Sequence, residues 1–234
     1  MIDFHSHILP KLDDGSQSSD MSLEMMRASF KHGVDVMVAT PHFYIRQNTV
    51  EKFVEYRKAS YHALKNKAEK SGEELPRVIL GAEVYYFGNF YAHLDIRKLC
   101  IENTDYLLLE MPFEPWTGKV MSDIEKLIYD CKIIPIIAHL DRYLDLQKKN
   151  SYIEELFSLG AVIQMNGDYI NGVFTSKNAV KLIKSNVVDL VGSDCHNMDK
   201  RPPNLDKAFK IIRAKCGEDV LERMDKRGRE ILNI

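Results

Sequence analysis

Short apolar runs alternate along the chain with longer stretches of helical periodicity. Seven runs have the length and composition of β-strands, and they cover residues 1–4, 34–39, 78–80, 106–109, 133–138, 161–165 and 187–191. Six stretches place apolar residues at helical spacing, at residues 21–31, 50–70, 120–131, 152–159, 178–184 and 205–215. The strand runs are too apolar to have one face in water, which is typical of a parallel sheet covered by helices.

This alternation favours an α/β barrel over an open sheet. The 234 residues are enough for one large α/β domain. No low-complexity segment, linker or internal repeat divides the sequence. We therefore expect a single domain over residues 1–234.

Side chains that bind metals follow six of the seven strand runs. Together with one further aspartate they form a set of nine: His5, His7, Asp14, His42, Glu83, Glu110, His139, Asp194 and His196. In a parallel barrel the C-terminal ends of all strands share one rim, so residues remote in sequence would meet there in one bowl. Alternate residues of a strand share a face, so both members of each His-x-His or Asp-x-His pair can turn inward together.

One such residue at a strand end is more often a hydrogen-bonded or salt-bridged side chain than a ligand, and we interpret His93 as structural. A set of nine such residues on one rim needs another explanation, because buried charges are costly without partners and metal cations are natural partners for them. A catalytic zinc needs only three protein ligands, so this set suits three ions. Imidazole and carboxylate without thiolate favour Mn²⁺, Fe²⁺ or Zn²⁺.

Cys195 and Arg201 have the Cys-x5-Arg spacing of a thiolate phosphatase, which offers a competing interpretation. Such an enzyme needs a glycine-rich loop whose N–H groups hold phosphate, and residues 196–200 contain no glycine. Strand alternation also turns Cys195 away from the side that Asp194 and His196 share. We therefore predict that Cys195 is not the nucleophile.

The composition of the chain limits the classes of binding partner and the cellular compartments that we expect. The net charge is −2 without long basic blocks, so nothing indicates binding to nucleic acid or to a membrane surface. The apolar runs are too short to cross a bilayer, and residues 1–7 lack the features of a secretory signal. Four scattered cysteines favour a reducing compartment over a disulfide framework, so we expect a cytoplasmic protein.

The motifs at these positions resemble the polymerase and histidinol phosphatase (PHP) superfamily. The resemblance is closest to its bacterial capsule-operon branch, the manganese-dependent protein-tyrosine phosphatases. It covers nearly the whole chain and rests on MIDFHSHILPKLDDGS, ATPH, GAEVYY, LLLEMPF, PIIAHLDRY, VGSDCHN and RPP, in that order. It implies a distorted seven-stranded (β/α) barrel related to the TIM barrel.

Carried over to this sequence, the resemblance implies a centre of three ions, most simply Mn²⁺. The three sets of ligands would be His5, His7, Glu83 and Asp194; a bridging Glu83 with Glu110 and His139; and Asp14, His42 and His196. Arg142 and Arg201 match arginines associated with the phosphate, and with His42 and His196 they are the candidate catalytic residues. Asp141 stands where relatives often have glutamate, a change that keeps the carboxylate.

The function that the resemblance implies is hydrolysis of phosphotyrosine on the tail of a bacterial tyrosine autokinase that controls capsule or exopolysaccharide synthesis. The enzyme would reach this membrane-bound kinase from the cytoplasm. Alternatives are a small-molecule phosphatase, such as one acting on histidinol phosphate, an amidohydrolase-type enzyme, and a non-catalytic metal-binding docking module. The sequence leaves open whether Trp116 grips a substrate tail or packs, and whether residues 217–234 pack beneath the barrel or contact a neighbour.

Overall fold

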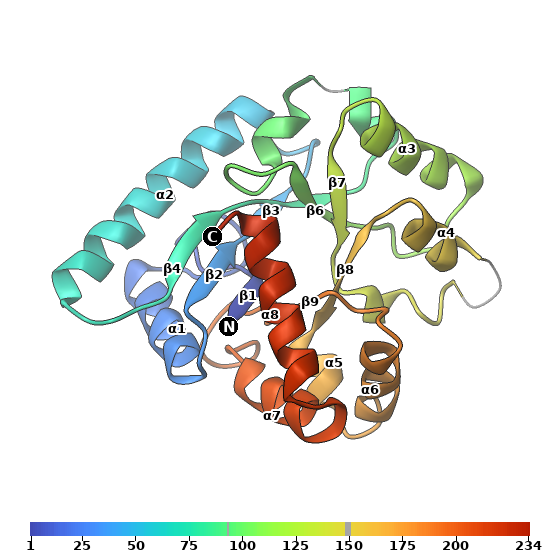
Figure 1. The fold of residues 1–234 in the computed structure, drawn as a ribbon. Helices are drawn as coiled ribbons and strands as arrows, with labels where there is room; N and C mark the ends of the chain where they lie inside the picture. Colours follow the sequence, from blue (N-terminus) through green and yellow to red (C-terminus); the bar gives the residue numbers. More distant parts are fainter. Residues whose placement is uncertain (93, 148–150) are drawn as a thin grey trace.

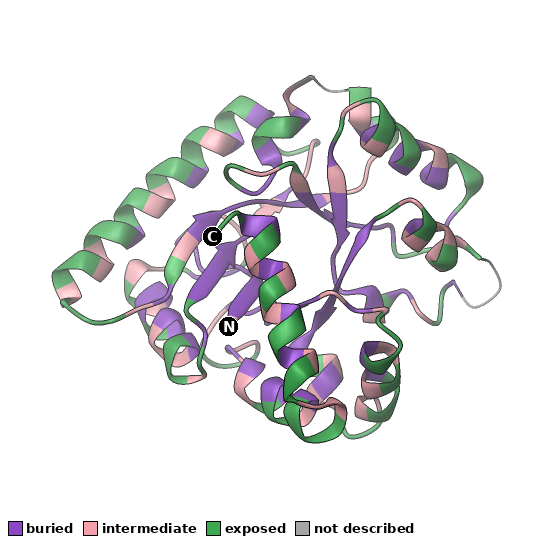
Figure 2. Cartoon of the chain, in the orientation of Figure 1, coloured by how far each residue is buried: buried purple, intermediate pink, exposed green. Residues whose placement is uncertain are grey.

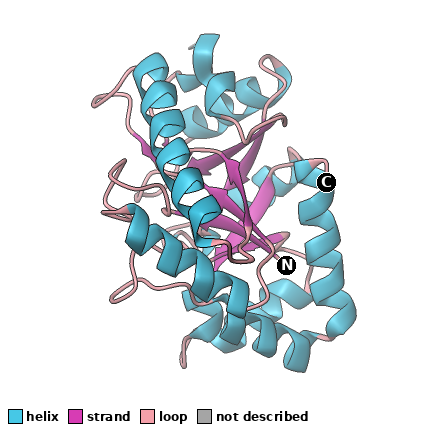
Figure 3. Cartoon of the chain, turned by 90° about the vertical axis from the view of Figure 1, so that its left-hand side faces the viewer, coloured by secondary structure: helices cyan, strands magenta, loops and turns pink. Residues whose placement is uncertain are grey.

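The protein consists of a curled parallel sheet surrounded by helices (Figures 1 and 3). Its structure, a computed structural model, describes residues 1–92, 94–147 and 151–234. His93, interpreted above as structural, lies outside the described residues. Within the described part of the chain, no helix has both the length and the apolar character that crossing a bilayer requires.

All seven predicted strands are present, and two of them continue after an interruption, so the described residues contain nine strands. They are β1 (Ile2–Ser6), β2 (Val36–Ala39), β3 (His42–Phe43), β4 (Arg77–Leu80), β5 (Glu83–Tyr85), β6 (Tyr106–Glu110), β7 (Ile134–Ile137), β8 (Val162–Asn166) and β9 (Leu190–Gly192). Strand β3 resumes β2, and β5 resumes β4. The seven strand positions that the sequence predicts are therefore correct.

The strands form two hydrogen-bonded groups, in the orders β1-β2-β4 and β3-β5-β6-β7-β8-β9, and all pairs are parallel. The last strand lies beside the first, because the Asp194 N–H donates to the His5 carbonyl (2.7 Å) and the His7 N–H to the Cys195 carbonyl (2.9 Å). The curled sheet thus joins its two edges. This confirms the predicted fold class, a distorted relative of the (β/α) barrel.

The two interruptions have local causes. Pro41 has no N–H to give to a ladder, and its carbonyl accepts the Glu83 N–H (3.0 Å). In the neighbouring strand the Gly81 carbonyl accepts a bond from the buried guanidinium of Arg57 (2.6 Å). After these interruptions the backbone becomes extended again, as β3 in one strand and as β5 in the other. His42 of β3 then pairs with Glu83 of β5.

The six predicted helices are confirmed, and the described residues add two α-helices and three 3₁₀ turns. The α-helices are α1 (Ser19–Lys31), α2 (Val50–Ser71), α3 (Gly118–Tyr129), α4 (Tyr152–Ser158), α5 (Gly167–Asn171), α6 (Ser176–Lys184), α7 (Leu205–Cys216) and α8 (Glu218–Leu232). The 3₁₀ turns are η1 (Phe90–Ala92), η2 (Leu94–Leu99) and η3 (Leu140–Arg142). Helix α8 carries a helical apolar pattern at Leu221, Met224 and Ile231 that the charged residues around it obscure.

Apolar side chains from seven strands meet inside the curled sheet. They belong to one buried cluster that includes Phe4, Val38, Leu108, Ile136 and Leu190, together with Ile231 and Leu232 of α8. Helix α8 crosses the strands at the front of Figure 1, and its inner face is buried while its outer face is exposed (Figure 2). Residues 217–234 therefore pack against the barrel strands and help to fill their interior.

Strand β1 serves both this core and the bowl above it. Phe4 belongs to the interior cluster, yet the next residue, His5, also turns inward, toward Glu83 and Asp194. The pairing with β2 shifts register between Asp3 and Ser6. Such a bulge lets two consecutive side chains lie on the same side, so one short strand supplies both core and site.

The contact between α8 and β1 predicts the effect of a small substitution. A methyl group on Gly228 would lie 2.5 Å from a ring carbon of Phe4 and 3.1 Å from Ile2. Alanine favours a helix over glycine by about 1 kcal/mol, but overpacking a core costs about 1–3 kcal/mol. We expect Gly228→Ala to lower the free energy of unfolding in urea, whereas Lys226→Ala on the exposed face should change it little. An unchanged or raised stability of Gly228→Ala would contradict this packing.

Candidate metal centre

The nine predicted ligand residues converge on one bowl at the C-terminal ends of the strands. His5 lies near the end of β1, His42 begins β3, Glu83 begins β5 and Glu110 ends β6. The others follow strands: His7 and Asp14 follow β1, His139 follows β7, and Asp194 and His196 follow β9. All except Asp14 and His42 are buried. The barrel geometry that the sequence predicts thus brings these distant residues into contact.

Glu83 is the centre of the bowl. Its carboxylate is buried, and Oε1 lies 2.9 Å from His139 Nε2. The other oxygen, Oε2, lies 3.3 Å from His5 Nε2 and 3.4 Å from His7 Nε2, and 2.8 Å from His42 Nδ1. One carboxylate therefore reaches all parts of the site, the position that a bridging ligand needs.

The other carboxylates extend the bowl on opposite sides. Asp194 Oδ1 lies 3.5 Å from His5 Nε2 and 3.4 Å from His7 Nε2. Glu110 Oε1 lies 3.5 Å from His139 Nε2. At the outer edge, Asp14 Oδ1 lies 3.5 Å from His42 Nε2 and 3.4 Å from His196 Nε2.

The spacing of these atoms fits shared cations. Ligand atoms about 2.1 Å from one ion are about 3.0–3.4 Å apart at octahedral or tetrahedral angles. Among the described residues, three groups have ligand atoms within 4.8 Å of one another: His7, Asp14, His42 and His196; His5, His7 and Glu83; and His42, Glu83 and Glu110. These groups overlap the three sets that the resemblance implies but divide them differently: His7 and His42 each belong to two groups, and Asp194 and His139 belong to none of the three.

Unsatisfied buried atoms also fit bound cations. Glu83 Oε2, His42 Nδ1 and His139 Nδ1 are buried without a hydrogen-bond partner among the described residues. Glu83 Oε2 and His42 Nδ1 lie 2.8 Å apart but lack hydrogen-bond geometry. Buried polar atoms normally have partners, and a cation is a suitable partner for two lone pairs that face each other. The donor set is oxygen and imidazole nitrogen, which suits Mn²⁺, Fe²⁺ or Zn²⁺.

The site holds its charges by mutual pairing. Burial alone would raise the pKa of the Glu83 and Asp194 carboxyls, but the neighbouring imidazoles, above all His5, hold both well below their usual range. Burial alone would likewise lower the pKa of His139, but its bonds to Glu110 and Glu83 raise it to about 9. Protons on the imidazoles therefore compete with cations, and metal binding must release them.

His196 is held in its neutral form. Burial, the nearby His7 and the guanidinium of Arg201 together lower its pKa to about 4. Its Nδ1 lies 2.9 Å from the Asp194 carbonyl, which leaves Nε2 directed toward Asp14. A neutral imidazole with a fixed orientation is the form that binds a metal.

Two arginines lie at the mouth of the bowl. Arg142 Nη2 lies 2.5 Å from Asp194 Oδ2, and Arg201 Nη2 lies 2.7 Å from Oδ1 of the same carboxylate. Arg201 Nη1 also lies 3.0 Å from His196 Nε2. Both side chains are partly exposed, and each guanidinium is paired with the buried Asp194 carboxylate.

The structure adds polar residues that the sequence pattern did not predict. Asp13 Oδ2 accepts the His7 Nδ1 proton (2.7 Å) and the His42 backbone N–H (3.0 Å). Its other oxygen accepts the Gly15 N–H (2.9 Å). One carboxylate thereby orients two ligand-type residues, in the way that outer carboxylates orient metal-binding histidines. Its adjacency to Asp14 was the available signal.

Strand β8, which carries none of the predicted site residues, also contributes. Gln164 Oε1 accepts the His139 backbone N–H (2.7 Å), and Gln164 Nε2 donates to Asn166 (2.9 Å). Asn166 in turn donates to Asp194 Oδ2 (2.9 Å), and its backbone N–H donates to Asp141 (3.1 Å). The alternation Gln-x-Asn was the signal, because two amides on one face of an apolar strand need polar partners.

Two site residues adopt backbone conformations that few side chains tolerate. His139 has φ 35° and Asp194 has φ 53°, both in the left-handed region. Such positions are uncommon for residues other than glycine and occur at functional sites that over-determine them. Here the Gln164 side chain holds the backbone of His139, and the β1 edge holds that of Asp194.

Cys195 lies outside the bowl, as predicted. It is fully buried in the cluster between the sheet and the helices that contains Ile8, Leu9 and Met25. Burial is the main cause that raises the pKa of its thiol well above the ordinary value. A reactive cysteine needs a lowered pKa and access, so the thiolate interpretation is wrong.

Two other features lie apart from the chemistry. Trp116 is buried, packs 5.4 Å from the Tyr143 ring and donates Nε1–H to the Pro112 carbonyl, so it stabilises the rim by packing.

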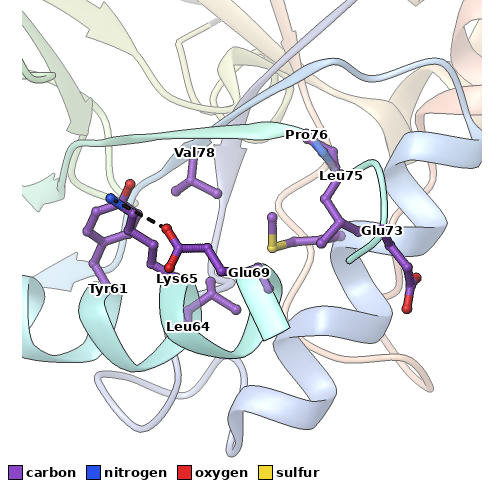
Figure 4. A pocket seen from close by; sticks show the side chains of 10 residues that line it. Tyr61, Leu64, Lys65, Glu69, Glu73, Leu75, Pro76 and Val78 are labelled. Atoms are coloured by element: carbon purple, nitrogen blue, oxygen red, sulfur yellow. Dashed lines mark ion pairs between the residues drawn. The ribbon is translucent and has the colours of Figure 1, made fainter. Parts of the chain in front are cut away.

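A pocket between α1, α2 and the start of β4 contains Glu69 and Glu73 (Figure 4). These pair with Lys65 (3.8 Å) and Arg27 (2.7 Å), so neither carboxylate there needs a metal.

Solved structures share the fold. A structure of the metal-dependent tyrosine phosphatases YwqE from Bacillus subtilis and CpsB from Streptococcus pneumoniae matches with a TM-score of 0.87 and 26% identity, over 100% of this chain and 94% of that chain. The phosphotriesterase homology protein of Escherichia coli, at 12% identity, matches with a TM-score of 0.54 over 95% and 94% of the two chains. The latter likeness concerns the fold alone.

Sequence comparisons lead to the same two groups of proteins, CpsB and YwqE, as the structural comparison. The tyrosine-protein phosphatase CpsB of Streptococcus agalactiae is 29% identical over 94% of this chain and 92% of its own length. The tyrosine-protein phosphatase YwqE of Bacillus subtilis is 31% identical over 94% of this chain and 87% of its own length. The model of the CpsB/CapC family of capsular polysaccharide synthesis matches residues 1–232. The chain therefore belongs to the CpsB/CapC family.

Proposed function

We propose that this chain is a metal-dependent protein-tyrosine phosphatase. The observation that carries the proposal is the bowl itself, in which nine donor side chains and two arginines converge at one rim. Relatives that match nearly the whole chain are named tyrosine-protein phosphatases, and the chain lacks none of the donor residues that the motifs supply. This completeness argues against a non-catalytic docking module.

The assignment of residues follows the resemblance. The proposed ligands of three divalent ions, most simply Mn²⁺, are His5, His7, Glu83 and Asp194; Glu83 with Glu110 and His139; and Asp14, His42 and His196. When bound, such ions would lower the pKa of a water molecule toward neutrality and offset charge on phosphate oxygens. Glu83 supports the set best, because four imidazoles surround its two oxygens.

The chain's own groups bind and orient the phosphoryl group. Arg142 and Arg201 would donate N–H bonds to phosphoryl oxygens, for which the fork of a guanidinium is suited. The water oxygen would bond to phosphorus as the bond from phosphorus to the tyrosine oxygen breaks. One proton of that water would end on the departing tyrosine oxygen, whose phenol has an ordinary pKa of about 10. No covalent intermediate on Cys195 is involved.

We also propose a substrate for the enzyme and a cellular location. The substrate is phosphotyrosine in a protein, in our proposal the tail of a bacterial tyrosine autokinase that controls capsule or exopolysaccharide synthesis. The family's link to capsular polysaccharide synthesis supports this. The four cysteines are free, which fits action in the cytoplasm on a kinase at the membrane.

Removal of metal tests the proposal directly. We expect EDTA to abolish hydrolysis of a phosphotyrosine peptide, because the water loses its activation, and added Mn²⁺ to restore it. Turnover is measured as released phosphate, with histidinol phosphate as the competing substrate at the same Mn²⁺ concentration. Chelator-resistant activity would overturn the proposal, and faster turnover of histidinol phosphate would replace the protein substrate with a small one.

Substitutions separate the bowl from the buried thiol. We expect His139→Ala and Asp194→Ala to lower kcat/KM by more than about 100-fold, because each removes a proposed ligand. Cys195→Ala should retain most of the activity. Metal content measured on each purified variant provides the control. Loss of turnover in Cys195→Ala with its metal retained would contradict the assignment.

Asp13 provides a test of orientation at a residue that is not a proposed ligand. In Asp13→Asn the amide must place its NH₂ against the Gly15 N–H or against the donors of His7 and His42. We expect Mn²⁺ affinity, measured by calorimetric titration, to fall about 10–100-fold, with turnover recovering at saturating Mn²⁺. Asp20→Asn removes the same charge from an exposed position nearby and should leave the affinity unchanged. Equal affinities in both variants would count against an orienting role.

A further inference from the structure

We propose that a groove beside the metal centre binds an apolar side chain of the substrate polypeptide next to its phosphotyrosine. We call it the aromatic groove and define it by Tyr44, Tyr85, Phe87 and Pro112. The inference rests on the proposed function and adds a basis for choosing proteins over small aryl phosphates.

The aromatic groove is built from the same rim as the bowl. Its residues come from the segments that follow β3 and β6 and from the end of β5 with the loop after it. In a parallel barrel these segments all lie at the C-terminal face. The groove has a volume of about 490 Å³, within the range of sites that enclose a ligand group.

The groove and the bowl adjoin each other. Tyr44 and Gln47 line the groove and also line a neighbouring pocket that contains Asp13, Asp14 and His42. The Tyr44 ring lies 5.3 Å from the His42 ring on one side and 5.8 Å from the Tyr85 ring on the other. Successive Cα atoms of a peptide are about 3.8 Å apart, so the residues that flank a phosphotyrosine bound in the bowl can reach a groove that adjoins it.

The chemistry of the groove indicates its occupant. Tyr44, Tyr85 and Phe87 are half-buried, and Pro112 is buried, so the walls offer aromatic and aliphatic surface in partial contact with water. The charged side chains that line it, Arg46 and Glu114, are exposed at its edge. Such a groove gains free energy by covering an apolar side chain, while the rim can contact the polar backbone on either side.

Tyr86 has a different role from the two aromatic residues of the groove that flank it in sequence. Its hydroxyl donates to the buried Asp123 (2.8 Å), and Asp123 also accepts the Asn89 N–H (3.2 Å). This anchors the loop after β5 to helix α3. Tyr86 is therefore a structural residue. Tyr85 and Phe87 on either side of it are the residues to test, and Phe87 also packs against the Phe90 ring at 6.0 Å.

The experiment compares three substrates, which are two phosphotyrosine peptides and one small aryl phosphate. We expect Tyr85→Ala and Phe87→Ala to lower kcat/KM for a phosphotyrosine peptide with leucine at both flanking positions about tenfold, mainly through KM. For 4-nitrophenyl phosphate and for a peptide with glycine at both positions, kcat/KM should stay within about twofold. Tyr129→Ala, an exposed aromatic at the end of α3, should behave as wild type with every substrate. Circular dichroism and Mn²⁺ content establish that each variant is folded and loaded.

The outcomes separate this inference from the proposed function. If the wild-type chain with Mn²⁺ hydrolyses no aryl phosphate, the proposed function fails. If it is active but the groove variants treat the leucine and glycine peptides alike, only the aromatic groove is refuted. An equal loss on 4-nitrophenyl phosphate with metal retained would also refute it, because the residues would then serve the reaction centre.

Discussion

The buried carboxylate of Glu83 is the constraint on which the site depends. An isolated charge at this depth would be very costly, and here four imidazoles from β1, β3 and the segments after β1 and β7 surround its two oxygens. The same arrangement that stabilises the charge presents nitrogen and oxygen atoms at the spacing of metal ligands. Stability of the bowl and capacity for cations therefore have one origin, and Asp194 and Glu110 extend it to either side.

The backbone departs from regular strands at the points where it serves this constraint. The bulge in β1 turns both Phe4 and His5 inward, so core and site share one strand. Pro41 and Gly81 interrupt two neighbouring strands. Both strands resume after the interruption, and this places His42 opposite Glu83. His139 and Asp194 take left-handed conformations that hydrogen bonds from neighbouring elements hold. Regular strands would direct these side chains elsewhere, and such irregularity is typical of functional sites.

The candidate metal ligands, the two arginines and the aromatic groove adjoin one another on the rim, and this arrangement fits the proposed protein substrate. Arg142 and Arg201 both pair with Asp194, and we propose that they bind the phosphoryl group there. The aromatic groove begins where the bowl ends, at Tyr44. Cys195 lies between two site residues in sequence, but it packs in the buried cluster between the sheet and the helices. Membership of the CpsB/CapC family agrees with the acidic and imidazole chemistry of the bowl rather than with the thiol.

The sequence by itself determined the seven strand positions and six of the helices, because hydrophobic period is a local property. It also predicted the nine residues of the bowl, since parallel strands deliver their ends to one rim. Tertiary structure alone decided which atoms meet. Asp13, Gln164 and Asn166 gain their roles only from partners far along the chain, and α8 completes a core assembled from seven strands. Such pairings depend on which segments lie side by side, and no local pattern carries that information.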